Sequence, residues 1–469
     1  MNSSSGISNA APTVGFRLPR LVLPRRGVDL AKWAVIACDQ YTSEPEYWQR
    51  VAQAVGDAPS TLHLIFPEVY LGAPDAPARI ATIQQAMRTY LGAGLLEERD
   101  GAVYVERTVD GRTRRGLMLE LDLEHYDFSA GSTSLIRPTE GTMVARLAPR
   151  IEVRRGADLE LPHVLVLIDD PEDTVIGPIA AAAGAVAPAA AGVRLARLYE
   201  TELMEGGGRV AGYAGDDARG QRAAFALQAL AQPQEFARRY GVPASTPPML
   251  FAMGDGNHSL ATAKSIWEQA KATVGMDHPS RWALVEVENI HDPALHFAPI
   301  HRVLFGVRTD ARGDVRAALT EAFGARLTCT EVSSAAEMRQ RVQAATGPRQ
   351  AAGLVGPGAR FSVLEVEGPG ASAGGPGAAS TSGLLVGALQ GFIDRFIERG
   401  GARDVDYVHG DDVLERLAQQ SGSVGFHLAT VGKSELLKRV VHDGPLPRKT
   451  FSMGEAHEKR YYVEARRIR

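Results

Sequence analysis

Apolar side chains recur along this chain with two different periods, and these periods predict where helices and strands lie. A spacing of three or four residues is typical of an amphipathic helix, as in the face formed by Trp48, Val51 and Val55. This spacing predicts helices over 44–55, 80–96, 195–204, 219–240, 314–323, 334–345, 384–399 and 433–441.

Strands are expected where apolar residues alternate with polar ones or form short unbroken runs. Residues 102–121 alternate around Asp110-Gly111, a dipeptide typical of a tight hairpin turn. Mainly apolar segments that also predict strands occur at 33–37, 162–168, 282–290 and 424–428. Helices and strands mix throughout, and hairpins occur beside strand–helix units. We therefore predict an α/β (mixed α+β) fold in which helices flank mixed sheets.

The chain has 469 residues, which is ample for more than one hydrophobic core. We expect residues 1–13 to form a disordered tail, 14–240 an N-terminal lobe and 241–469 a C-terminal lobe, with the functional site between the lobes. Residues 367–382 are rich in Gly, Ala, Pro and Ser and are expected to form a flexible loop.

The composition indicates an ordinary globular protein and excludes some classes of partner. Hydrophobic residues make up 45% of the chain and charged residues 23%, as in ordinary soluble proteins. The net charge is −4 and no basic tract is present, so nucleic acid is not an expected partner. Cys38 and Cys329 are the only cysteines, which excludes a disulfide framework and fits the cytoplasm. The oligomeric state stays open.

No membrane segment is expected. The first dozen residues lack the apolar stretch of a secretory signal. A long uncharged run, 175–193, consists mostly of Ala and Gly with two prolines, and is poor in the Leu, Ile and Phe that drive membrane insertion. We interpret this run as a sheltered Ala-rich helix.

The stretch 248–264 combines an apolar strand, a tight turn and the start of a helix. The residues of the turn are Gly254, Asp255, Gly256, Asn257, His258 and Ser259. Helix N-termini carry unpaired N–H groups that favour an anion, and glycines let a ligand approach the backbone closely. This turn is the first candidate for a functional site. Alternatively, Asp255 or Asn257 only caps the helix and His258 is a surface residue.

Two further motifs also carry candidate chemistry. Arg137, Glu140 and Thr142 share a predicted turn and could hold a small zwitterion or a phosphate; the alternative is a surface salt bridge. Asp170 follows the strand at 162–168, where it could bind Mg²⁺ or, alternatively, cap a helix.

Two cationic motifs lie in the second half of the chain. His301-Arg302 follows an apolar segment, and an arginine there could bind a phosphate or carboxylate through two hydrogen bonds. Lys449 lies in a short basic segment near the C-terminus. The alternatives are an exposed His-Arg pair and a basic surface tail. No pair of histidines with a nearby carboxylate stands out as a metal site.

Taken together, these motifs resemble the family called domain of unknown function 1015, in order and over almost the whole chain. The family's Asp-Gly-His-His-Arg turn corresponds to 255–259, and its His-Glu element near a Thr to Glu140 and Thr142. Its remaining motifs correspond to 170–172, 299–302 and 447–450.

The resemblance implies an activity. The turn is similar to one in ParB/sulfiredoxin-like proteins, among them kinases that phosphorylate free serine, and some family members have been linked to the same reaction. It implies a cytosolic kinase that uses ATP or ADP with Mg²⁺ and acts on a small-molecule hydroxyl, L-serine first. The alternative is a nucleotide- or metabolite-binding protein without catalysis.

The resemblance also assigns roles to residues of this sequence. Catalytic roles would go to Asp255, His258 and Glu140, and Mg²⁺ binding to Asp255 and Asp170. The substrate would be held by Arg137 and Thr142, and the nucleotide by Gly254, Gly256, Asn257, Ser259, His301, Arg302 and Lys449.

The turn departs from the family pattern at two positions, with Asn257 in place of His and Ser259 in place of Arg. Losing the arginine removes a phosphate-binding side chain. We expect Arg302 or Lys449 to replace its charge.

Overall fold

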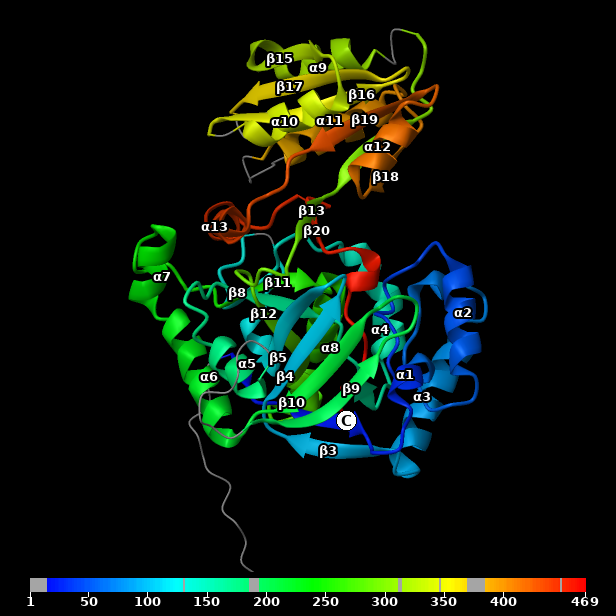
Figure 1. Ribbon diagram of the computed structural model, residues 1–469, viewed down its shortest axis with the longest axis vertical. Coiled ribbons are helices and arrows are strands. Elements are labelled where there is room, and N and C mark those ends of the chain that lie inside the picture. The colour runs from blue at the N-terminus through cyan, green and yellow to red at the C-terminus, as the bar shows by residue number, and fades with distance from the viewer. Residues whose placement is uncertain are drawn as a thin grey trace, which may run out of the picture.

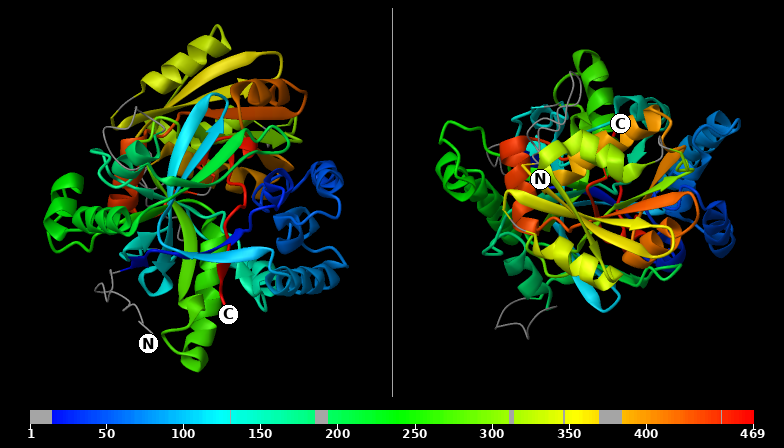
Figure 2. Two further views of the ribbon diagram at one scale, coloured as in Figure 1. Left: turned by 60° about the horizontal axis from the view of Figure 1, so that its bottom comes forward. Right: turned by 90° about the horizontal axis from the view of Figure 1, so that it is seen from above.

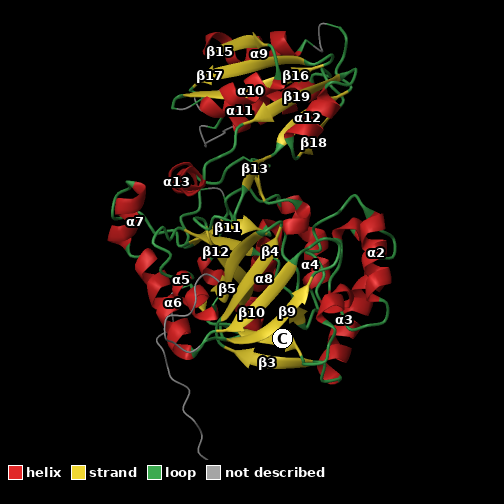
Figure 3. Cartoon of the chain, in the orientation of Figure 1, coloured by secondary structure: helices red, strands yellow, loops and turns green. Residues whose placement is uncertain are grey.

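The computed structural model describes residues 15–129, 131–184, 194–310, 314–345, 347–368, 384–447 and 449–469. These residues form a larger body around one mixed sheet and a smaller body around an antiparallel sheet, drawn at the bottom and the top of Figure 1. Strands gather in the middle of each body and helices lie outside them (Figure 3). The predicted α+β class is confirmed.

The larger sheet has nine strands within the described residues. In spatial order the main path is β6 (Ile136–Arg137), β11 (Phe251–Asp255), β8 (Leu165–Ile168), β12 (Trp282–Asn289), β5 (Arg112–Asp122), β4 (Val103–Val109), β10 (Arg209–Ala214) and β9 (Ala196–Glu202). β1 (Phe16–Arg17) pairs with β5. Only the β6–β11 and β8–β12 pairs are parallel. The sheet takes strands from both sides of residue 240, so the predicted boundary between lobes does not separate the two sheets.

Both faces of the larger sheet are buried, which explains why its central strands carry apolar side chains on both faces. In β5, Leu117 and Leu119 join one hydrophobic cluster, whereas Met118 points to another on the opposite face. The larger body carries α1 (Leu30–Trp33), α2 (Pro45–Val55), α3 (Ala76–Gly92), α4 (Leu147–Arg154), α5 (Gly177–Ala183), α6 (Asp217–Leu230), α7 (Pro233–Tyr240) and α8 (Asn257–Val274). Figure 2 shows α2 and α3 on the opposite side of this body from α6 and α7.

The smaller body has an all-antiparallel sheet. Its spatial order is β15 (Leu327–Val332), β17 (Arg360–Glu367), β16 (Arg349–Gly356), β19 (Ser423–Leu428), β14 (His301–Phe305) and β18 (Asp404–Val408). Its helices are α9 (Val315–Phe323), α10 (Ala335–Ala344), α11 (Leu385–Glu398), α12 (Asp411–Ala418) and α13 (Lys433–Asp443). The largest hydrophobic cluster joins residues of this body to Leu165 and Leu167 of β8, so the two bodies pack directly on each other.

The C-terminal segment returns to the larger body after the smaller one is complete. Three two-stranded sheets complete the fold, and two of them use this segment: β13 (Phe297–Pro299) with β20 (Phe451–Met453), β7 (Leu159–Glu160) with β21 (Arg466–Arg467), and β2 (Arg20–Pro24) with β3 (Leu96–Asp100). The C-terminus therefore lies within the outline of the larger body in Figure 1. No described helix combines the length and apolar character needed to cross a membrane.

Several predicted elements are confirmed. Hairpin β4–β5 turns at Asp110 and Gly111, which have φ of 49° and 74°. Two positive φ angles are the signature of the tight turn that an Asp-Gly pair favours. The predicted strands at 162–168, 282–290 and 424–428 correspond to β8, β12 and β19.

Two predicted helices are wrong. Residues 195–204 form strand β9, because they pair with β10 and Tyr199 covers Gly212 on that neighbour. The single helix predicted over 219–240 is two helices, α6 and α7, because Pro233 has no N–H to continue the first.

Other predictions fall partly or wholly outside the described residues. The tail 1–13 and most of the loop 367–382 lie outside them. Of the Ala-rich run 175–193, residues 177–183 form α5.

Buried ion pairs hold the C-terminal segment on the larger sheet. Arg460 pairs with Glu286 of β12 at 3.3 Å and with Glu464 at 2.6 Å, and all three side chains are at most 4% exposed. Removing one member of a buried pair leaves the others as unpaired buried charges, which typically costs about 3–5 kcal/mol.

We therefore predict that Arg460→Met lowers the free energy of unfolding by about 3–5 kcal/mol, measured by urea denaturation. Arg308→Met removes an exposed pair with Asp310 and is the control, for which the change should be small. Equal effects of the two substitutions would contradict a structural role for the buried pairs.

Candidate functional site

The turn between β11 and α8 brings the backbone close to its neighbours. Gly256 has φ of 76°, a conformation that side chains disfavour, and a Cβ there would lie 2.9 Å from Cα of Val164. At Gly254 a Cβ would lie 2.5 Å from Sδ of Met453. Position 256 therefore requires glycine, whereas a side chain at Gly254 would require Met453 to move. No side chain caps α8, whose first amides point toward the turn.

This turn lines a polar cavity of about 420 Å³ between the two bodies. The larger body also contributes Asp39, Glu68 and the segment 139–143, and the smaller body contributes Tyr407 and His409. The C-terminal segment supplies the remaining wall. The candidate turn and the motif around Glu140, 115 residues apart, thus meet in space.

Four cations line the polar cavity among the described residues: Arg146, Arg150, Lys449 and Lys459. Arg150 pairs with Glu68, and Lys459 pairs with Asp255 at 3.0 Å. Within the described part of the chain, no ion pair engages the guanidinium of Arg146, whose residue is exposed. The cavity therefore offers a positive charge beside the amides of the helix N-terminus, a combination that suits an anion.

Asp255 is held in its ionised form. Burial alone would raise the pKa of this carboxyl, but Lys459, His163 and the amide of Gly256 together bring the pKa below its ordinary value. The Gly256 amide donates to Oδ1 at 2.9 Å, while Oδ2 faces Lys459. The site thus keeps one fixed negative charge at the end of β11.

His258 is held in its neutral form. Burial and the neighbouring charges of Arg150 and Arg146 lower the pKa of its imidazole to about 4. Its Nε2 accepts from the amide of Met143 at 3.4 Å, which leaves Nδ1 as the protonated nitrogen. The ring is therefore a neutral hydrogen-bond donor at neutral pH.

Asn257 and Ser259 connect the turn to other segments. Asn257 accepts from the hydroxyl of Tyr126 at 3.2 Å and donates to the carbonyl of Glu140 at 3.0 Å. The hydroxyl of Ser259 lies 2.8 Å from Nε2 of His163. These two residues fasten the turn to the rest of the larger body.

Glu140 holds the C-terminal segment against the polar cavity. Its carboxylate accepts from the amides of Lys449 and Thr450, each at 3.1 Å. Burial raises the pKa of Glu140, and these amides partly offset that effect. Thr142 lies in the same loop, between two residues that line the cavity.

Five of the predicted site residues do not line the polar cavity: Thr142, Arg137, Asp170, His301 and Arg302. Arg137 donates to the carbonyls of three residues and is fully engaged in holding the loop at 133–137. Asp170 lies at the opposite end of β8 from the turn, where it accepts from the amide of Val175. Asp170 does not cap a helix, because α5 begins at Gly177 with Ile176 at its N-cap position.

His301 and Arg302 lie on β14 of the smaller body. Arg302 is buried and donates to the carbonyl of Ile300, with its guanidinium 5.3 Å from the ring centre of Tyr407. It therefore does not replace the arginine missing from the turn. Lys449 does line the polar cavity.

His301, His427 and Asp411 form the one cluster among the described residues with a metal-ligand composition. Nδ1 of His301 accepts from the amide of Leu428 at 3.1 Å, so a neutral His301 carries its proton on Nε2, which faces Asp411. Such a ring has no lone pair for a metal. The cluster instead joins β14, β19 and α12 by hydrogen bonds.

Sequence reasoning missed Arg146, Arg150, Lys459, Asp39 and Glu68. None of them belongs to a motif, and each reaches the polar cavity only through the packing of its own element. For Arg146 and Arg150, the only local signal in the sequence is their spacing of four residues, which places two positive charges on one face of a helix.

These features define a mixed α+β protein whose glycine turn and helix N-terminus open into a polar cavity between two bodies. The sequence profile of a family described as protein of unknown function (DUF1015) matches residues 22–381, and the chain belongs to this family. Lys449 and Lys459 lie beyond the matched residues. Comparison with curated proteins gives no match.

Solved structures resemble the chain only distantly. A conserved hypothetical protein from Pyrococcus furiosus is 11% identical, with a TM-score of 0.33 over 74% of this chain and 90% of its own. A free serine kinase in complex with AMP is 11% identical, with a TM-score of 0.35 over 74% and 90%. A C-terminally truncated SbnI from Staphylococcus aureus is 12% identical, with a TM-score of 0.32 over 71% and 84%.

The lowered pKa of His258 predicts how the stability of the protein depends on pH. Between pH 6.5 and about 4 the unfolded chain binds a proton at this ring and the folded chain does not. Stability from this residue is therefore complete above pH 6.5 and is lost as the pH falls toward 4.

We predict that His258→Gln loses less stability than the wild type between these pH values, as measured by urea denaturation at several pH values. The exposed His296→Gln is the matched control and should follow the wild type. If the wild-type and His258→Gln curves run parallel, the imidazole is not held neutral by the site.

Proposed function

We propose that this protein is a kinase that transfers a phosphoryl group from ATP or ADP to the hydroxyl of a small molecule, with free L-serine as the first candidate. One observation carries the proposal: the uncapped N-terminus of α8 opens into a cavity with four cations. Phosphoryl transfer depends mainly on positioning and on neutralising charge, and these residue types supply both.

The phosphates would lie against the start of α8. Gly256 leaves room for close approach, and the amides of Asn257 and His258 point to the ligand. Neutral His258 would donate from Nδ1 to a phosphate oxygen. Arg146, with no ion pair within the described residues, would supply the positive charge that the family's arginine gives in the turn.

Asp255 would position the acceptor. The hydroxyl oxygen of the acceptor forms the new bond to phosphorus, the phosphoanhydride bond to the departing nucleotide breaks, and the hydroxyl proton passes to the carboxylate of Asp255. Lys459, at 3.0 Å, would keep this carboxylate oriented. Glu140 would act by holding Lys449 beside the phosphates.

Mg²⁺ would be held mainly by the phosphates of the nucleotide, together with a carboxylate of the polar cavity. Asp39, Glu68 and Asp255 line this cavity, but their oxygens do not form a ligand cluster of their own. Bound there, Mg²⁺ would neutralise charge on the phosphates. Asp170, at the other end of β8, is not part of this set.

A second candidate function is nucleotide or metabolite binding without catalysis. It is favoured by the engagement of two carboxylates within the protein, since Asp255 pairs with Lys459 and Glu140 accepts from backbone amides. This function predicts a complex with ATP or serine and no product.

We predict that the wild type with Mg²⁺ converts serine, or another hydroxy amino acid or small alcohol of a panel, to its phosphate ester with ATP or ADP, as measured by phosphorus NMR. Asp255→Asn should abolish transfer, because no carboxylate then takes the proton from the hydroxyl that is phosphorylated. Asp277→Asn changes an exposed carboxylate and should retain full activity. Full activity of folded Asp255→Asn would refute the assignment of this site.

We further predict that Arg146→Met raises the KM for the nucleotide about tenfold or more, because a charge-assisted hydrogen bond to phosphate typically contributes about 1.5–3 kcal/mol. Arg155→Met, at the end of α4, removes an exposed arginine and is the control. An unchanged KM in Arg146→Met would place the phosphates elsewhere.

A further inference from the structure

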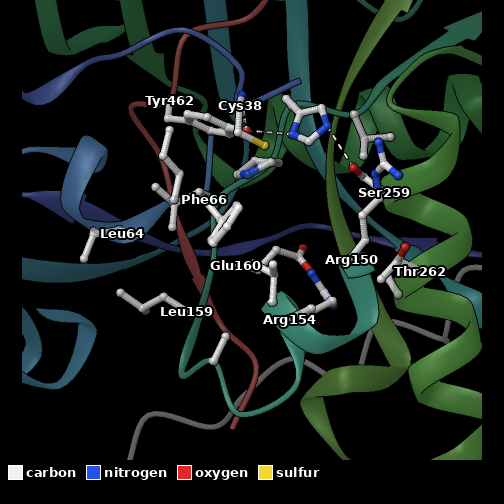
Figure 4. Close-up of a pocket in the computed structure, with 18 of the residues that line it drawn as sticks. Cys38, Leu64, Phe66, Arg150, Arg154, Leu159, Glu160, Ser259, Thr262 and Tyr462 are labelled. Carbon is white, nitrogen blue, oxygen red and sulfur yellow. Dashed lines mark hydrogen bonds and ion pairs between the residues drawn. The ribbon is translucent and has the colours of Figure 1, made fainter. Parts of the chain in front are cut away.

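A second, mainly apolar cavity of about 150 Å³ lies beside the first turns of α8 (Figure 4). Leu64 and Phe66 line it on one side and Leu159 lies below them. Leu260 and Ala263 of α8 also line it. Leu64 and Leu159 belong to one hydrophobic cluster and Leu260 and Ala263 to another, and the two clusters lie on opposite faces of the larger sheet. The cavity is therefore a gap between cores rather than part of one.

The apolar and the polar cavities share a wall. Glu68, Arg150 and Ser259 line both of them. Ser259 comes from the first turn of α8, and its hydroxyl lies 2.8 Å from His163. A ligand held at the start of α8 is thus separated from the apolar cavity only by side chains that already belong to the candidate site.

The polar groups around the apolar cavity find partners within the protein. Arg154 is paired with Glu160 and Arg150 with Glu68, and the hydroxyl of Thr262 donates to a backbone carbonyl. Tyr462 contacts Nδ1 of His163 at 2.7 Å, one of the bonds drawn in Figure 4. No described residue of this wall has a buried side-chain nitrogen or oxygen without a partner. A ligand in this cavity therefore needs to offer only apolar contacts, because no polar group of the wall needs a hydrogen bond from it.

We propose that this cavity is a subsite for the apolar group of the acceptor, of about the size of a phenyl ring. An apolar cavity of this volume stays dry and binds benzene in an engineered protein. An empty gap between two packed cores lowers stability, so an occupant stabilises the fold. The assignment of the occupant as the acceptor rests on the proposed function, and it makes an aromatic hydroxy amino acid a better acceptor than serine.

The subsite itself is tested by binding of toluene to the wild-type protein, without nucleotide. Toluene should raise the melting temperature in a saturable way, because it binds the folded state only. Pyrene, which is too large for the cavity, should not. Absence of a toluene effect, or an equal effect of pyrene, would overturn the subsite.

Variants locate the bound toluene. Ala263→Leu fills the cavity from α8 and Ala157→Leu fills it from the segment after α4, so each should abolish the toluene effect. Ala272→Leu adds the same side chain on an exposed face of α8 and should leave the effect intact. If toluene still raises the melting temperature of a folded Ala263→Leu or Ala157→Leu variant, toluene does not bind in this cavity. If neither variant folds, the comparison of toluene with pyrene on the wild type tests the subsite.

The acceptor is tested by comparing kcat/KM for serine and 3-phenylserine with ATP. Burial of apolar carbon strengthens binding about fourfold per methylene, so we expect at least a tenfold preference for 3-phenylserine that Ala263→Leu abolishes. Equal kcat/KM values for serine and 3-phenylserine would overturn the assignment of the acceptor, but the kinase assignment would stand. Toluene binding with no transfer to any acceptor would retain the subsite and refute the kinase.

Discussion

The candidate site depends on the cations of the C-terminal segment, which neutralise carboxylates buried in the larger sheet. Glu286 of β12 and Glu120 of β5 point to the face that this segment covers, and Arg460 and Arg466 reach them at 3.3 and 3.7 Å. Charges at such depth are tolerated only when paired. The arginines therefore hold the segment in one position, which brings Lys459 to Asp255.

The same return of the chain also joins the two bodies. The carboxylate of Glu140 accepts from the amides of Lys449 and Thr450, and β20 pairs with β13 two residues before the smaller body begins at β14. The polar cavity is thus enclosed by a segment that is anchored on both sides of it. Because the anchors are buried, the relative position of Lys449, Lys459 and the turn is determined by the fold rather than by a flexible tail.

Local pattern predicted the turn at 254–259 because strand, glycines and helix start are consecutive in sequence. It failed for β9, where Tyr199 belongs to a strand only because Gly212 on the neighbouring strand leaves room for it. It also could not find Arg146 or Lys459, which reach the turn through tertiary packing. Arg302 shows the converse, since a motif that suits an anion is used inside the smaller body.

The arrangement around Ser259 connects the two cavities chemically. A serine at this position is short enough to bond His163 at 2.8 Å and to leave the apolar cavity open behind it. The family's arginine would extend from the same place on α8, over a wall that Arg150 and Glu68 already occupy with their ion pair. Under the proposed function, Arg146 and Arg150 would take the cationic role of the arginine that the resemblance expects in the turn. The shorter Ser259 would then leave the space beside the turn to the acceptor that we propose.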